Sequence, residues 1–192
     1  GGAGLVWTGT VLPTNIQFDN PFAMQFDGSN DRVVMSSTSL VSGASQATVS
    51  MWFYPHNNVG STQALLGWES GANGLQIDWA GTMRCYVGLA GWNNANYAAS
   101  NVSLNVWHHL SCVWDGSAIF MYIDGLQVAS ASAAGTITSI NQPVYIASYG
   151  NDDSWSFNGK IDDVRIYNRA LSANEVVNLY RGRYANGGSG TA

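Results

Sequence analysis

Charged side chains are scarce in this chain of 192 residues, at 10%, where an average soluble domain carries about a quarter. Lysine occurs once and arginine six times, and the formal net charge is −5. Sites that bind nucleic acid or anionic lipid need clustered cations, so this composition argues against both partners. No apolar run approaches the roughly 18 residues that span a bilayer, which argues against membrane insertion.

Proline (four residues) and cysteine (two residues) are also rare. Two cysteines are too few for a disulfide-dense scaffold. Cys85 and Cys112 lie in separate apolar runs, and the sequence leaves open whether they are two buried thiols or one bridge. Glycine, by contrast, supplies 22 residues and aromatic side chains 12% of the chain, a composition typical of strands joined by tight turns.

Short runs of β-branched and aromatic residues, separated by Gly, Asn or Asp, dominate residues 5–167 and predict an all-β domain. The expected strands are 5–11, 23–27, 32–35, 48–54, 64–68, 75–79, 83–89, 107–114, 119–124, 127–131, 143–147 and 160–167. So many strands need two packed sheets. The pairs Asp115-Gly116 and Asp124-Gly125 predict primed hairpin turns on either side of 119–124. That strand is apolar on both faces, which predicts a central position.

One helix is predicted near the C-terminus, where Ser172 and Glu175 form a capping-box pattern and Gly182 supplies an end. The apolar face of this helix consists of Val176, Leu179 and Tyr180. The chain is therefore expected to form one domain over 23–184. Residues 1–22 are expected to be a β-prone arm or an added edge strand, and residues 185–192 a flexible tail.

Three sequence blocks carry a family likeness. They are Phe-Asp-Gly-Ser-Asn-Asp-Arg-Val at 26–33, Trp-His-His-Leu through Met-Tyr-Ile-Asp-Gly at 107–125, and Phe-Asn-Gly-Lys-Ile-Asp-Asp-Val-Arg-Ile-Tyr-Asn-Arg-Ala-Leu-Ser at 157–172. Together they resemble laminin-G-like domains of the concanavalin A-like jelly-roll superfamily, in the variant common in bacterial and phage proteins. The resemblance implies a jelly-roll sandwich of two antiparallel sheets, one of them concave. Similar domains bind glycans, bind proteins, build surfaces or carry glycosidase sites.

The acidic residues argue against an enzyme. Glycoside hydrolysis needs two carboxyl groups across the scissile bond, but Glu69 stands alone and Glu175 belongs to the helix cap, so the Glu-x-Asp-x-x-Glu motif of related glucanases is absent. Asp78, flanked by apolar residues, is interpreted as structural. His108 and His109 are adjacent in a strand and face opposite ways, so they cannot share one site.

Four carboxylates suggest calcium. Asp27, Asp31, Asp162 and Asp163 lie in two blocks that come together near one edge in similar domains, and oxygen ligands of this kind suit calcium. The alternative is structural: Asp27 belongs only to a turn, and Asp163 pairs with Arg165 on the same strand face.

Two segments, expected to be loops, combine aromatic rings with amide side chains, a mixture that stacks on sugar rings and bonds to hydroxyl groups. Their candidate ligand residues are Trp92, Asn93, Asn94, Asn96, Tyr97, Tyr149, Asn151, Asp152, Asp153 and Trp155. The same side chains would also suit covering the core or packing on a neighbouring subunit.

The sequence favours a non-catalytic, lectin-like recognition module that binds carbohydrate or a glycosylated surface, with calcium ordering the rim. The alternative is a structural subunit of an extracellular assembly, such as a phage capsid decoration, a tail fibre or a bacterial surface filament. In that case the arm at 1–22 would complete the sheet of a neighbouring copy. Both hypotheses imply a protein of the extracellular space, cell surface or virion surface.

Overall fold

The computed structural model describes residues 23–35, 41–58, 62–68, 74–89, 91–137, 143–150 and 153–182, except for the side chains of Trp68, Trp92 and Ser154. The expected arm at 1–22, with its strand at 5–11, and the expected tail at 185–192 lie outside these residues. Within this part of the chain, no helix has the length and apolarity that crossing a membrane requires.

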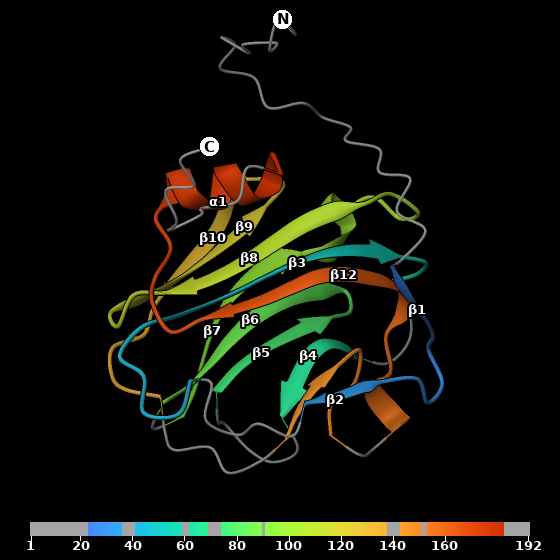
Figure 1. The fold of residues 1–192 in the computed structure, drawn as a ribbon, viewed down its shortest axis with the longest axis horizontal. Coiled ribbons are helices and arrows are strands. Elements are labelled where there is room, and N and C mark those ends of the chain that lie inside the picture. The colour runs from blue at the N-terminus through green and yellow to red at the C-terminus, as the bar shows by residue number, and fades with distance from the viewer. Residues whose placement is uncertain are drawn as a thin grey trace, which may run out of the picture.

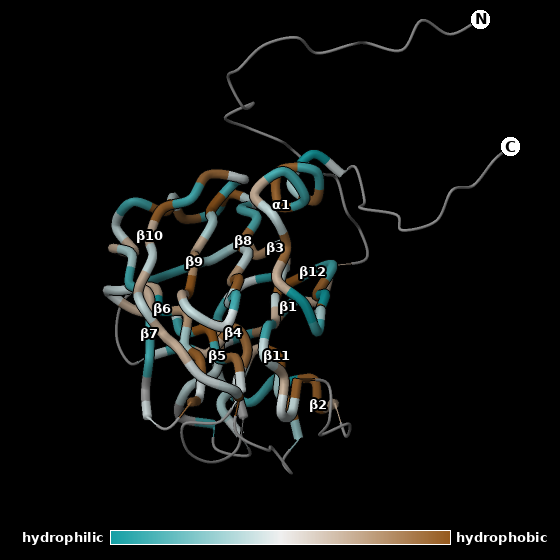
Figure 2. The backbone as a smooth tube through the Cα atoms, turned by 90° about the vertical axis from the view of Figure 1, so that its left-hand side faces the viewer, coloured by the Kyte–Doolittle hydropathy of each residue, from teal (hydrophilic) through white to brown (hydrophobic). Residues whose placement is uncertain are grey.

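The described strands form two antiparallel sheets of six strands each, stacked as the two layers of a sandwich (Figures 1 and 2). The first sheet contains, in spatial order, β1 (Met24–Asp27), β12 (Asn158–Tyr167), β3 (Ala47–Pro55), β8 (His108–Trp114), β9 (Ala118–Ile123) and β10 (Leu126–Ser132). The second sheet contains β2 (Val33–Met35), β11 (Val144–Ile146), β4 (Gln63–Trp68), β5 (Gly74–Trp79), β6 (Thr82–Leu89) and β7 (Gly91–Ala98). Two short 3-10 turns, η1 (Ala99–Asn101) and η2 (Asp153–Trp155), interrupt the connections.

The expected strands that fall within the described residues are all present, with ends shifted by one or two residues. One expectation is wrong: residues 91–97 form strand β7 and not a loop. β7 pairs with β6 along its whole length, from Gly91 opposite Leu89 to Ala98 opposite Thr82. Asparagine disfavours strands, so the local composition hides an edge strand that its neighbour specifies.

The two hairpin turns differ. Asp124 and Gly125 both have positive φ, 52° and 78°, which confirms the primed turn between β9 and β10. The primed turn expected at Asp115-Gly116 is wrong, because Gly116 alone of this pair has a positive φ. The Asp115 carboxylate instead accepts hydrogen bonds from the backbone N–H groups of Ser117 and Ala118, each at 2.8 Å.

Strand β9 is central, as expected, since it lies between β8 and β10. Met121 packs in the core between the sheets, whereas Tyr122 packs in a second apolar cluster on the opposite face. That cluster includes Val176 and Leu179 of helix α1 (Ala173–Tyr180), which covers the first sheet on the side away from the second sheet (Figures 1 and 2). The predicted capping box at the start of α1 is confirmed.

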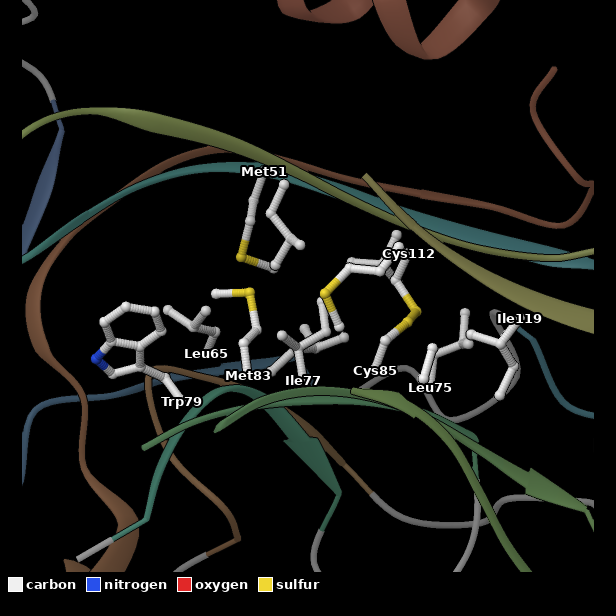
Figure 3. Close-up of a cluster of buried hydrophobic side chains, with 14 of the residues drawn as sticks. Met51, Leu65, Leu75, Ile77, Trp79, Met83, Cys85, Cys112 and Ile119 are labelled. Carbon is white, nitrogen blue, oxygen red and sulfur yellow. A yellow bond between two sulfur atoms is a disulfide. The ribbon is translucent and has the colours of Figure 1, made fainter. Parts of the chain in front are cut away.

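Cys85 of β6 and Cys112 of β8 form a disulfide that joins the two sheets through the core (Figure 3). Their Cα atoms are 6.0 Å apart, an ordinary separation for a bridge. The bridge lies beside Leu75 and Ile119, so it is enclosed by apolar side chains. The structure thus decides between the two alternatives that the sequence left open.

Candidate functional site

A pocket of about 430 Å³ lies on the face of the second sheet that points away from the core. Leu75, Ile77 and Trp79 of β5 belong to the core, so the alternation of a strand directs Gln76 and Asp78 to the opposite face. The same alternation brings side chains of β6 and β7 to this face. The pocket is lined by Gln76, Asp78, Tyr86, Asn94, Tyr149 and Trp155.

One wall of the pocket is aromatic. The rings of Tyr149 and Trp155 have centroids 4.8 Å apart and planes inclined by 33°. Both side chains are half-buried, so each is held in place while part of it stays accessible. A partly exposed pair of tilted rings forms an apolar surface on which a flat ligand face can pack.

Glycine allows this wall to sit close to the sheet. A Cβ atom on Gly67 of β4 would lie 2.7 Å from the Ser148 carbonyl oxygen and 3.3 Å from Cδ2 of Tyr149. A larger residue would therefore push the Tyr149 backbone outward. The sequence alone does not identify Gly67 as a site residue, because Ser148 and Tyr149, which lie next to it in the fold, are about 80 positions further along the chain.

Trp155 is positioned by η2, which is tied to the connection between β1 and β2. The Ser156 hydroxyl donates to the Ser29 carbonyl oxygen at 2.9 Å. Arg32 forms an ion pair with Asp153. These two contacts join segments that are far apart in sequence and fix the start and end of the turn that carries the indole.

The opposite side of the pocket is polar and buried. Asp78 is 1% exposed, and its Oδ1 accepts a hydrogen bond of 2.7 Å from the Gln76 side chain. Its Oδ2 lies 3.8 Å from Nη1 of Arg84 and has no hydrogen-bond partner among the described residues. Burial raises the pKa of Asp78 from 3.8 to about 6, although the Gln76 hydrogen bond, the Arg84 charge and the nearby Tyr86 hydroxyl act against it.

Tyr86 and Asn94 complete the polar side. The Tyr86 hydroxyl accepts a hydrogen bond of 3.3 Å from Arg84. Burial, followed by the charge of Asp78, raises the pKa of Tyr86 above its ordinary value. Asn94 donates to Asn96, its neighbour on the same strand face. Phenol and amide groups of this kind both donate and accept hydrogen bonds.

The structure brings only some of the expected ligand residues together. Asn94, Tyr149 and Trp155 line the pocket, whereas Tyr97 packs against the core. Asn93 has the same strand parity as Tyr97, and its side chain donates to the Gly91 carbonyl oxygen. The remaining candidates are accounted for as follows: Asn96 lies beside Asn94, Asp153 pairs with Arg32, and Asn151, Asp152 and the Trp92 side chain lie outside the described residues.

Sequence reasoning missed Gln76 and Tyr86 as pocket residues and assigned Asp78 a structural role only. A signal was present in β5, where the polar Gln76 and Asp78 alternate with core residues. A strand whose polar face is nonetheless buried indicates that something else covers that face. Here the covering is partly the Tyr149–Trp155 wall.

The four candidate calcium ligands do not come together in the structure, contrary to the expected grouping. Asp27 pairs with Asn158 in the ladder, which leaves Asp162 roughly 13 Å and Asp163 roughly 16 Å further along β12. In the described part of the chain, no three His, Cys, Asp or Glu side chains group closely enough to hold a metal ion.

The same acids have structural roles. Asp27 accepts a hydrogen bond from the Ser29 N–H at 2.7 Å, and Asp31 accepts one from the Asp27 N–H at 3.0 Å. Asp163 pairs with Arg165 at 2.8 Å. These partners fit the structural alternative, and the acids do not form the oxygen cage that calcium needs.

A laminin G-like family model, described as the concanavalin A-like lectin/glucanases superfamily, matches residues 27–177. The chain belongs to this superfamily. The resemblance seen in the three sequence blocks is thereby confirmed. A comparison with curated protein sequences finds no match.

Solved structures of this superfamily's fold are similar to the chain. A carbohydrate-binding module of a Ruminococcus gnavus sialidase, bound to α2,3-sialyllactose, has 14% identity and a TM-score of 0.68, over 82% of this chain and 96% of that one. Domain 4 of an extracellular arabinanase from Geobacillus stearothermophilus, in complex with arabinotriose, has 22% identity and a TM-score of 0.66, over 85% and 79%. A pentraxin from Limulus polyphemus has 15% identity and a TM-score of 0.66, over 84% and 82%. Identities this low show a shared fold alone.

Proposed function

We propose that this chain is a non-catalytic, lectin-like module that binds carbohydrate in the pocket of the second sheet. The observation that carries the proposal is the Tyr149–Trp155 wall facing a buried carboxyl group across one pocket. Sugar rings have apolar C–H faces that pack on aromatic rings and hydroxyl groups that bond to carboxyl and amide groups. The pocket offers both contacts in a volume typical of small-ligand sites.

The pocket supports binding better than hydrolysis. Glycosidases use two carboxyl groups, about 5–9.5 Å apart. Asp78 is the one acid among the residues that line the pocket in the described structure. The sialyllactose and arabinotriose bound to the similar modules add support for a carbohydrate ligand.

A glycan array followed by titration calorimetry tests this function. Trp155→Ala is expected to weaken binding of the best glycan at least tenfold, because it removes half of the aromatic wall. Trp107→Ala is the matched control: it removes the indole that packs on Tyr54 of β3, where the two ring centroids are 5.6 Å apart. Unchanged binding in Trp155→Ala, or equal losses in both variants, contradicts the site.

A structural subunit of an extracellular assembly is the second candidate, favoured by exposed apolar side chains on two outermost strands. Met24 of β1 is 54% exposed and Val34 of β2 is 51% exposed. Light scattering on the intact chain, with calcium and after chelation, tests this candidate. A defined oligomer supports it, and dissociation on chelation supports calcium at the contact; a monomer in both buffers contradicts it.

Both candidates place the protein outside the cell or on a virion surface. The buried Cys85–Cys112 disulfide supports this location, since such bridges form and persist in oxidising compartments.

A further inference from the structure

We infer that the pocket selects neutral, hydroxyl-rich sugars over acidic sugars, and that the Asp78 carboxylate is the group that determines this choice. The inference rests on the proposed function and names the ligand class of the same site. It depends on how the two oxygens of one buried carboxylate are partnered.

The two oxygens of Asp78 differ in their partners. Oδ1 already accepts the Gln76 hydrogen bond at 2.7 Å, whereas Oδ2 accepts none from the described residues. Nη1 of Arg84, at 3.8 Å, is too far for a hydrogen bond. A buried acceptor without a donor destabilises the empty pocket, so a molecule that brings a donor to Oδ2 is favoured. Sugar hydroxyl groups are such donors.

The charge of the pocket disfavours an acidic ligand. Asp78 is the charged side chain among the described residues that line it. The Arg84 side chain is 33% exposed and donates to the Tyr86 hydroxyl, so its charge is partly solvated, and it is not among the residues that line the pocket. A ligand carboxylate has no proton to give to Oδ2 and would meet a like charge where solvent screens little.

The aromatic and amide residues that also line the pocket add no charge that would reverse this preference. Tyr149 and Trp155 offer ring faces, and Asn94 offers a neutral amide. A neutral pyranose or furanose can therefore place its C–H face on the aromatic wall and a hydroxyl on Oδ2 in one pose. An acidic sugar in that pose would bring its carboxylate into the same small volume as Asp78.

The test compares matched glycans on the intact chain at pH 7.5: galactose against galacturonic acid, and glucose against glucuronic acid, each as the terminal unit of the same oligosaccharide. The wild type is expected to bind the neutral member of a pair at least tenfold more tightly. Asp78→Asn, which keeps the shape and removes the charge, is expected to reduce this ratio to less than threefold. Asp162→Asn, which removes one negative charge from the first sheet, is the control and should keep the wild-type ratio.

Near-UV circular dichroism of each variant verifies that it is folded. Tighter or equal binding of the acidic member by the wild type, or a wild-type ratio in Asp78→Asn, overturns the inference and leaves the carbohydrate-binding function standing. If the wild type binds no glycan on the array, both the function and the inference fail.

Discussion

Two buried titratable side chains, Asp78 and His109, link the stability of this protein to pH in opposite directions. Asp78 is held next to the pocket on the second sheet, and His109 lies between the first sheet and helix α1. The exposed fraction is 1% for Asp78 and 2% for His109. Burial disfavours the charged form of each group, which for an acid and a base means opposite shifts in pKa.

Asp78 should reduce stability at neutral pH. The pKa of Asp78 is 3.8 without burial and about 6 in the folded chain. Between pH 3.8 and pH 6, the folded chain therefore holds a proton on Asp78 that the unfolded chain has largely lost. The free energy of unfolding therefore falls as the pH rises through this range, by about 3 kcal/mol in total. We expect the stability of Asp78→Asn relative to wild type to increase by most of that amount between pH 4 and pH 8, measured by urea unfolding. A difference that does not change with pH contradicts this prediction.

His109 should reduce stability in acid. Its Nε2 lies 2.9 Å from the Ser50 hydroxyl, its Nδ1 has no hydrogen bond in the described structure, and burial lowers its pKa from 6.5 to about 4. The unfolded chain binds the proton first as the pH falls, so the stabilisation present above pH 6.5 is lost on going through pH 4. In His109→Gln, the loss between pH 7 and pH 4 should be smaller by about 3 kcal/mol in urea unfolding. An unchanged loss would show that the imidazole stays solvated.

Gly67 should matter for binding more than for folding. In Gly67→Ala, the new methyl group would lie 2.7 Å from the Ser148 carbonyl oxygen, so the segment that carries Tyr149 must move away from β4. We expect glycan affinity to fall at least fivefold in titration calorimetry, with a far-UV spectrum like that of wild type. Gly81→Ala, at a position where a Cβ atom would meet nothing within 4 Å, is the control.

Among the strands, the alternation of apolar and polar residues predicts those with strong β-propensity. It misses β7, whose residues have low β-propensity. β9 is apolar on both faces. One face packs in the core between the sheets, and the other packs in the second apolar cluster, which includes residues of helix α1. β7 is rich in asparagine and becomes a strand because β6 offers an eight-residue ladder. Propensity acts within a segment, but pairing depends on a partner that local composition does not describe.

Helix α1 begins with a capping box that can be tested separately from the pocket. The Ser172 hydroxyl accepts from the Glu175 N–H at 3.3 Å, and the Glu175 carboxylate accepts from the Ser172 N–H at 2.8 Å. Ser172→Ala should lower the free energy of unfolding by about 1 kcal/mol, measured in urea. Glycan affinity should not change, because α1 covers the first sheet and the pocket lies on the second. A loss of binding would show coupling between the two sheets.

At the scale of the whole molecule, the Cys85–Cys112 bridge is the covalent link between the sheets. Replacing both cysteines by alanine should lower the free energy of unfolding by about 2–5 kcal/mol, measured by urea unfolding. Thiol titration of the unreduced, unfolded chain should find no free thiol. Two free thiols, or a double variant as stable as wild type, would contradict the bridge.

The order of residues alone predicts the sheet-rich fold class, the central strand, the helix with its cap, and the family. Each of these depends on contacts between near neighbours or on local motifs, which the order of residues contains directly. Of the site, it indicated Asn94, Tyr149 and Trp155, because aromatic and amide side chains suit sugars wherever they stand.

Which of these residues form a pocket depends on the folded arrangement of the two sheets. This arrangement joined Tyr149 and Trp155 to Gln76 and Asp78, which lie about 75 positions earlier in the chain. It also separated Asp27 from Asp162, since the register of β1 on β12 places them at different points along the ladder. Proximity between distant segments follows from sheet pairing and packing, which are properties of the assembled chain and not of any one segment.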